Sequence, residues 1–173
     1  MPKRCTIRRK DRLVVSRVVA ITILLLIAVQ PVFSQSSYIK KYQPLADSLA
    51  DEYEIPVAII LGVAIVESGG GNSRNSKLLN NHFGIVGKND LLKTKGIRTR
   101  YKQFPDVASS YVAFCKLVKK RKYYNKLKGN SDFTKWLEAM SKSGYTEAPE
   151  EWKKRITTVI RKHKLSATPE TNL

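Results

Sequence analysis

Cysteine and histidine are scarce in this 173-residue chain, which has two of each. Cys5 lies in a basic N-terminal stretch that we expect to be removed, which leaves Cys115 without a partner for an internal disulfide. Cys115 shares a helical face with apolar residues, so we interpret it as a packing residue and not as a nucleophile. Neither His82 nor His163 has metal-ligating neighbours at the usual spacing. The sequence therefore predicts no metal site, and we expect no cofactor.

Acidic residues are also few: 14 against 32 lysines and arginines, which gives a formal net charge of +18. Residues 1–34 hold seven of the cations and one acid, so their removal lowers the charge to +12. Such a charge is typical of proteins that meet a polyanion, which can be a nucleic acid, a membrane surface or an anionic cell wall. The export predicted below argues against nucleic acid, and no aromatic–basic motif supports it. A solvated basic surface without a specific partner is the alternative.

Residues 1–34 have the three parts of a secretory signal peptide. Six cations precede residue 13, an apolar run follows over Val18–Val29, and Ser34 stands after the helix-breaking Pro31. We predict cleavage near Ser34 and export to the periplasm, the cell envelope or the medium. An uncleaved signal anchor is the alternative, against which Arg17 and the shortness of the run argue. Because no cysteine comes directly after the apolar run, we expect no lipid anchor. We also expect no stable membrane insertion after cleavage.

A second apolar stretch, Val57–Val66, contains only side chains that are apolar or absent. It is too short to span a bilayer, which takes ~20 residues. Pro56 suits the start of a helix and Gly69 suits the left-handed position just past its end. We therefore predict a short helix that is buried on all sides and whose last turn delivers Glu67 to a glycine-rich edge.

Glu67 is the candidate catalytic residue. Burial and the negative end of the helix dipole both disfavour an ionised carboxylate there, so we expect its pKa to be raised. A carboxyl group that stays protonated near neutral pH is what a general acid needs. The alternative is a glutamate that merely ends a core helix and reaches water.

The rest of the pattern predicts an α+β fold that is mostly α. Apolar periodicity and caps indicate helices over residues 36–53, 106–119, 132–143 and 149–164. Phe83–Val86 and Ile97–Phe104 are typical of short strands, and we expect them to pair as a small hairpin beside the helical body. We place one domain at residues 35–165, without internal repeats or linkers, and a disordered tail at residues 166–173.

Four stretches of the chain resemble motifs of one enzyme family and occur in that family's order. The motifs E-S-G-x-G-x-S, N-N-x-F-G-I, Y/F-R-x-Y and G-Y-A-T-D-P are matched in turn by residues 67–73, 80–85, 101–104 and 144–149. The last of them precedes a helix with an aromatic and a basic residue, here Trp152 and Arg155. The chain thus resembles glycoside hydrolase family 73, bacterial N-acetylglucosaminidases that cut peptidoglycan and include flagellar cell-wall hydrolases. The resemblance covers roughly residues 38–164.

The resemblance implies a lysozyme-like fold, with a helical body, a small β-hairpin lobe and a groove that binds a glycan strand. It implies that Glu67 is the general acid that protonates the leaving glycosidic oxygen and that Tyr145 lies beside the scissile sugar. It also implies a substrate-binding role for four residues near the groove floor: Ser68, Asn81, Phe83 and Gly84. For Phe83 and Gly84, a purely structural turn is the alternative.

A second carboxylate is harder to identify. The family often carries another glutamate in the β-lobe, but residues 88–104 contain only Asp90, and Val86 stands where a lysine is common. Glycosidases usually use two carboxylates. Asp90 and Glu147 are the candidates, although both can be solvated loop acids. In that case the 2-acetamido group of the substrate can supply the nucleophile, an exception known among these enzymes.

We therefore predict a monomeric, exported peptidoglycan hydrolase. It would act as an endo-β-N-acetylglucosaminidase on glycan strands, cutting the β-1,4 bond between N-acetylglucosamine and N-acetylmuramic acid. One alternative is a lytic transglycosylase-type muramidase, for which a single glutamate suffices. Another is a non-catalytic peptidoglycan-binding module, which the missing lobe acid favours.

Overall fold

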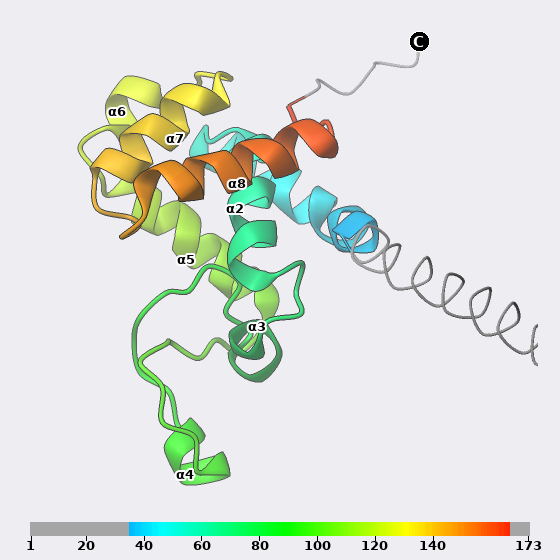
Figure 1. The fold of residues 1–173 in the computed structure, drawn as a ribbon, viewed down its shortest axis with the longest axis vertical. Helices are drawn as coiled ribbons and strands as arrows, with labels where there is room; N and C mark the ends of the chain where they lie inside the picture. The colour runs from blue at the N-terminus through cyan, green and yellow to red at the C-terminus, as the bar shows by residue number, and fades with distance from the viewer. Residues whose placement is uncertain (1–34, 167–173) are drawn as a thin grey trace, which may run out of the picture. The chain divides into compact units, whose positions relative to one another are not determined.

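The computed structural model describes residues 35–166, so the predicted signal peptide and nearly all of the predicted tail lie outside the described residues. A helix over residues 35–53 opens this part of the chain. The helices that follow are α2 (Val57–Ser68), α3 (Arg74–Leu79), α4 (Leu91–Lys95), α5 (Val107–Lys119), α6 (Tyr124–Leu127), α7 (Phe133–Lys142) and α8 (Pro149–Lys162) (Figure 1). The mostly helical fold is therefore confirmed. None of the helices within residues 35–166 has the length and apolar character needed to cross a membrane.

The core is built around α2. Every residue from Ala58 to Ile65 is buried, and the helix contacts α5, α7 and α8. It follows Pro56, and Gly69 ends it with a left-handed φ of 59°, as the sequence predicts. Neighbours enclose the middle of the helix, and its last turn, with Val66 and Glu67, is only partly buried.

The main packing partner of α2 is α8, which crosses it (Figure 1). Trp152, Ile156 and Ile160 recur every four residues and form the buried stripe of α8. Gly62 of α2 faces this stripe: a Cβ at Gly62 would lie 2.9 Å from Ile160 Cγ1 and 3.1 Å from Ile156 Cγ2. The absence of a side chain at Gly62 thus allows α8 to approach α2.

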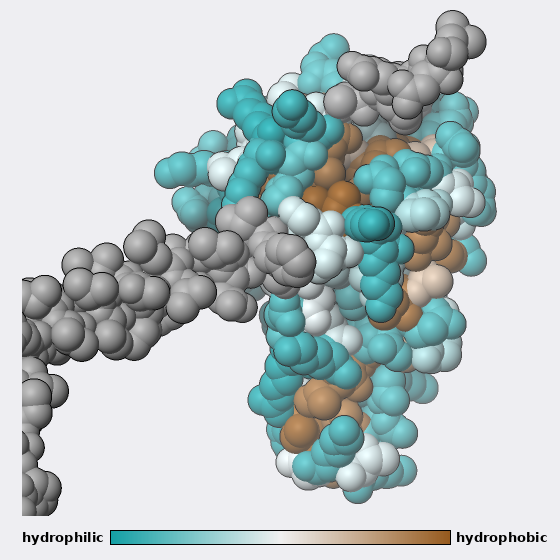
Figure 2. Space-filling view, turned by 90° about the vertical axis from the view of Figure 1, so that its right-hand side faces the viewer, coloured by the Kyte–Doolittle hydropathy of each residue, from teal (hydrophilic) through white to brown (hydrophobic). Residues whose placement is uncertain are grey.

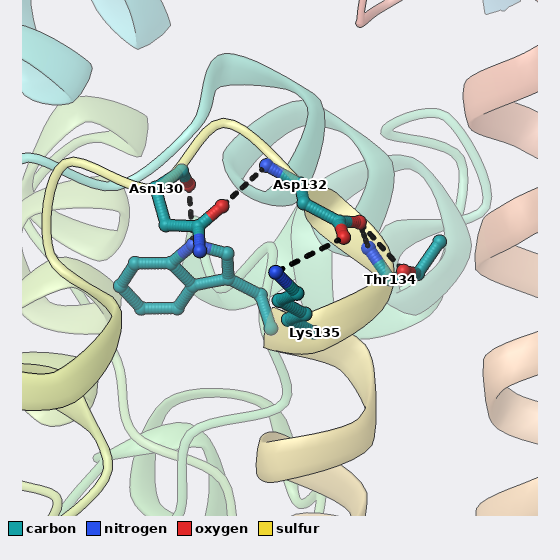
Figure 3. A network of polar contacts seen from close by, with 5 residues as sticks. Asn130, Asp132, Thr134 and Lys135 are labelled. Carbon is teal, nitrogen blue, oxygen red and sulfur yellow. Dashed lines mark hydrogen bonds and ion pairs between the residues drawn. The ribbon is translucent and has the colours of Figure 1, made fainter.

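The start of α7 is held by a polar network that Figure 3 shows. Asp132 Oδ1 accepts hydrogen bonds from Thr134 N at 2.9 Å and Thr134 Oγ1 at 2.6 Å, so the predicted cap is confirmed. Asn130 joins this cap to the core, because its carbonyl oxygen accepts a hydrogen bond from the buried Trp136 Nε1 at 2.8 Å. Lys135 lies 3.9 Å from Asp132 Oδ2, an exposed contact that contributes little.

The predicted β-hairpin is not confirmed. Antiparallel pairing is limited to one bridge between Val86 and Tyr101, with backbone hydrogen bonds on either side of it. Beyond it the Asn89 side chain donates to the carbonyl oxygens of Thr99 and Tyr101, and the turn is occupied by α4. Side-chain amides thus replace the backbone ladder that a pair of regular strands would need. We call residues 84–104 the α4 lobe.

Candidate active site

Glu67 is the last residue but one of α2 and lies half-buried where the helix leaves the core. Burial raises the pKa of its carboxyl group above the ordinary value for glutamate. Two groups oppose burial by favouring the ionised form: a hydrogen bond from Trp152 and, secondarily, the charge of Arg155. Burial prevails, so the direction expected from the sequence is confirmed.

Trp152 fixes the orientation of this carboxyl group. Its indole Nε1 donates a hydrogen bond to Glu67 Oε1 at 2.8 Å, and the indole itself is buried at the start of α8. The periodicity of α8 identifies Trp152 as a core residue but does not reveal this bond. The available signal was its position, with Arg155, directly after the G-Y-A-T-D-P-like segment. Trp152 leaves Oε2 as the carboxyl oxygen not engaged by the indole.

Replacing Trp152 by phenylalanine tests this arrangement. Trp152→Phe keeps an aromatic ring but removes the hydrogen bond that lowers the Glu67 pKa, so the pKa should rise further. An acid used in its protonated form then stays active to higher pH, so the basic limb of the pH profile of kcat/KM should move to higher pH. Trp136→Phe is the matched control, because Trp136 Nε1 bonds to Asn130 and not to Glu67. An unmoved limb in Trp152→Phe, or an equal shift in both variants, would contradict the assignment.

The loop at Gly84 lies directly against the carboxyl group. A Cβ built on Gly84 would lie 3.8 Å from Glu67 Oε2 and 3.8 Å from Tyr101 Cε1. Gly84 also has a φ of +65°, a conformation that other residues rarely adopt. The fold therefore brings Gly84 of the N-N-x-F-G-I-like segment and Tyr101 of the third motif close to Glu67 of the first. Tyr101 is half-buried beside Gly84, and its place in the third motif did not by itself predict a position next to Glu67.

Tyr145 packs against Trp152 and lies close enough to Glu67 for the charge of that carboxyl group to affect its pKa. Its ring centre lies 5.2 Å from that of Trp152 and 6.3 Å from that of Phe114. Burial, and then the nearby charge of Glu67, raises the pKa of its hydroxyl, which therefore stays protonated. Among the described residues, this hydroxyl is the buried side-chain polar atom without a hydrogen-bond partner. Native structures rarely leave a buried polar group in this state.

Three of the predicted substrate-binding residues, Ser68, Asn81 and Phe83, are buried and make hydrogen bonds or ring contacts within the protein. Ser68 Oγ donates to the Ala64 carbonyl oxygen at 2.6 Å and accepts from Gly71 N at 2.8 Å. The Asn81 side chain bonds to backbone atoms of Ile85 and Lys102, near the two ends of the α4 lobe, and Phe83 stacks on Phe114 at 4.3 Å. The polar atoms and rings of these three residues are thus engaged within the protein, and Gly84, the fourth, borders the carboxyl group.

The two candidate second carboxylates are not brought to Glu67 by any hydrogen bond or ion pair of the described chain. Asp90 is exposed and immediately precedes α4, which Figure 1 shows below α3 and away from α2. Glu147 is exposed in the turn before α8. Glu67 is therefore the acid that the described fold places among Gly84, Trp152 and Tyr145.

Other polar side chains do not form a metal centre. Within residues 35–166, no group of three or more histidines, cysteines, aspartates or glutamates is placed to hold a metal ion. His82 is buried, shares a 2.6 Å hydrogen bond with the Tyr38 hydroxyl, and has its pKa lowered by burial to about 4. Cys115 packs in the core, where burial raises the pKa of its thiol to about 12.

Comparison with known proteins identifies the family of the chain. The family model described as mannosyl-glycoprotein endo-beta-N-acetylglucosaminidase matches residues 43–165. No curated protein sequence matches the chain.

Three solved structures are similar. The catalytic domain of the autolysin Auto from Listeria monocytogenes has a TM-score of 0.64 at 19% identity, covering 77% of this chain and 86% of that one. A peptidoglycan hydrolase mutant from Sphingomonas sp. A1 has a TM-score of 0.59 at 18% identity, covering 75% and 94%. A type VI secretion system effector–immunity complex from Pseudomonas protegens gives 0.56 at 20% identity, covering 78% and 95%. At these identities the similarity establishes a shared fold.

Proposed function

We propose that this chain, which belongs to glycoside hydrolase family 73, the glucosaminidases, cuts peptidoglycan strands between N-acetylglucosamine and N-acetylmuramic acid. The observation that carries the proposal is the carboxyl group of Glu67, held by Trp152 at 2.8 Å, bordered by Gly84 and given a raised pKa by burial. Such a group can act as the general acid.

In the first step, the protonated Glu67 gives its proton to the glycosidic oxygen. The bond between this oxygen and C1 of N-acetylglucosamine breaks, and the chain that begins with N-acetylmuramic acid leaves with a new hydroxyl group. Glu67 is then ionised, and the indole N–H of Trp152 stabilises the carboxylate. The same carboxylate can later take a proton from the water that completes hydrolysis.

We further propose that the nucleophile of the first step is the 2-acetamido oxygen of the N-acetylglucosamine unit. Asp90 and Glu147, the alternatives, are both exposed and share no hydrogen bond or ion pair with Glu67 within the described residues. The acetamido oxygen would bond to C1 as the leaving oxygen departs, and water would open the resulting ring. The unpartnered hydroxyl of Tyr145 is suited to donate a hydrogen bond to the acetamido group. This course retains the configuration at C1, which NMR of the first-formed product can check.

Mass spectrometry of digested, purified sacculi tests the reaction itself. Hydrolysis as proposed yields fragments with N-acetylglucosamine at the reducing end. Fragments ending in 1,6-anhydro-muramic acid would instead establish the lytic transglycosylase reaction, and binding without release would establish a non-catalytic wall-binding module.

The proposed substrate requires action outside the cytoplasm. We therefore propose export, with residues 1–34 acting as a cleaved signal peptide, and a monomer that works on the wall. N-terminal sequencing of the protein from the envelope or medium should begin near Gln35, and a protein that starts at Met1 would reject cleavage.

A further inference from the structure

The α4 lobe is strongly basic, and its cations have no acidic partners in the described structure. Residues 84–104 contain one acid, Asp90, and six cations, all exposed: Lys88, Lys93, Lys95, Arg98, Arg100 and Lys102. The ion pairs found within residues 35–166 lie on other elements and use other lysines. Like charges in one small segment repel one another, so this composition favours an anion from outside the chain.

The basic segment is continuous with the catalytic carboxyl group. The guanidinium carbon of Arg100 lies 5.7 Å from the centre of the Tyr101 ring. The same ring borders Gly84, which in turn borders Glu67 Oε2. An anionic group attached to a sugar bound at Glu67 therefore meets cations on the lobe side of the site. Arginine suits this role because its planar guanidinium matches a carboxylate with two parallel hydrogen bonds.

Exposed hydrophobic side chains accompany these charges. Val86 and Leu92 are 61% and 53% exposed, and Figure 2 shows hydrophobic residues among hydrophilic ones at the lower end of the view, over the α4 lobe. A basic and partly apolar surface can also meet an anionic membrane. However, even a whole myristoyl chain gives only marginal membrane binding, and two single side chains provide less. Continuity with Glu67 favours the substrate instead.

We propose that the α4 lobe binds the carboxylates of peptidoglycan stem peptides, so that the enzyme prefers peptide-bearing glycan strands. The inference rests on the proposed function. If the bond cut is the one between N-acetylglucosamine and N-acetylmuramic acid, the sugar on the leaving side is the muramic acid, whose lactyl group carries the stem peptide. The peptide then begins on the same sugar that receives the proton from Glu67, and Arg100 is the lobe cation whose position beside Tyr101 is best suited to receive it.

The test compares two matched variants on two forms of one substrate. Arg98→Gln/Arg100→Gln removes two lobe charges. Arg161→Gln/Lys162→Gln removes two exposed charges from the far end of α8, at least nine residues, or ~14 Å, along the helix from Trp152. The substrates are sacculi stripped of attached polymers, either native or with carboxylates converted to neutral amides by carbodiimide and ammonia.

On native sacculi, kcat/KM of the lobe variant should fall by roughly three- to tenfold, as expected for losing two partly exposed charge contacts, and the α8 variant should stay within about twofold of wild type. On amidated sacculi the wild-type enzyme and the lobe variant should be equal, because the charge that the arginines recognise is gone. A lobe variant that behaves like the α8 variant on native sacculi, or loses as much on amidated sacculi, would overturn the proposal.

Two further arms identify the anion. Strands freed of stem peptides by an amidase keep a carboxylate on each lactyl group, and on them wild-type kcat/KM should drop to that of the lobe variant. If the wild-type enzyme remains faster than the lobe variant on these peptide-free strands, the stem peptide is not the ligand. The same conclusion follows if the lobe charges matter for binding to anionic phospholipid vesicles but not for native sacculi. Should the wild type release no sugar from any substrate, the proposed function fails, and co-sedimentation with native and amidated sacculi still tests the lobe.

Discussion

Replacing Glu67 by glutamine should lower the release of reducing sugar from sacculi by ~10²–10⁴-fold, the usual contribution of general acid–base catalysis. Glutamine has the size of glutamate, and its carbonyl oxygen can still accept the hydrogen bond from Trp152 Nε1. It has no proton to give to a glycosidic oxygen. Asp90→Asn and Glu147→Gln, measured in the same assay, should both stay near wild type if the acetamido group supplies the nucleophile. A strong loss in either one would identify it as a second catalytic carboxylate.

The same substitution has an opposite effect on stability. The pKa of Glu67 is higher in the folded protein than in the unfolded chain, because burial disfavours the charge. Between the two pKa values the unfolded chain gives up this proton while the folded protein keeps it, so the stability of the wild type falls as pH rises through this window. Glu67→Gln lacks this loss. It should match the wild type in acid and be the more stable protein above the raised pKa, which thermal unfolding at several pH values would measure. A folded Glu67→Gln protein with near-wild-type turnover would leave Glu67 as no more than the end of a core helix.

The sequence predicted α2 and its carboxyl group well because both depend on local information. An unbroken apolar run, a proline before it and a glycine after it specify a buried helix and its two ends, and Glu67 follows from its place in the last turn. Burial in turn specifies the direction of the pKa shift. The cap at Asp132 was predictable for the same reason, since a cap is set by neighbours in the chain.

The α4 lobe was predicted less well because its structure depends on side chains that replace backbone pairing. The composition of residues 83–86 and 97–104 indicated two strands, but Asn81 and Asn89 satisfy carbonyl groups that a ladder would otherwise bond. Periodicity cannot distinguish these cases. The burial of Ser68 was likewise not predicted, because its place in the motif says nothing about whether its side chain faces the solvent or the protein.

Trp152 shows a third limit. Its spacing with Ile156 and Ile160 places it correctly on the buried face of α8, but the bond to Glu67 spans 85 positions of sequence and depends on how closely α8 approaches α2. That distance is set by Gly62, a residue that looks neutral in an apolar run. A side chain at Gly62 therefore tests whether helix packing controls the catalytic group.

Gly62→Val should lower both stability and activity. Its Cβ would lie 2.9 Å from Ile160 Cγ1 and 3.1 Å from Ile156 Cγ2, closer than packed carbon atoms allow, and Ile156 and Ile160 are both fully buried. Overpacking of this kind costs ~1–3 kcal/mol of unfolding free energy. An outward shift of α8 would relieve these close contacts, but it would also withdraw Trp152 from Glu67. A displacement of ~1 Å at a catalytic group can cost ~10²-fold in rate. Urea unfolding and sacculus digestion measure the two losses separately.

A double-mutant cycle with Ile160→Ala decides whether the helix spacing is the cause. Ile160→Ala alone leaves a cavity and should be destabilising, but it removes Cγ1, the atom that the new Cβ would meet at 2.9 Å. In the double variant the valine methyl groups can fill part of that cavity. The loss of stability measured for the double variant should therefore be smaller than the sum of the losses of the two single variants, and its activity should be higher than that of Gly62→Val. Gly62→Ala is the graded comparison: its gain of up to about 1 kcal/mol in helix propensity opposes the contact with Ile160, so it should lie between the wild type and Gly62→Val. If the losses of Gly62→Val and Ile160→Ala are strictly additive and activity stays low in the double variant, the valine acts through α2 itself and the spacing of α8 does not position Glu67.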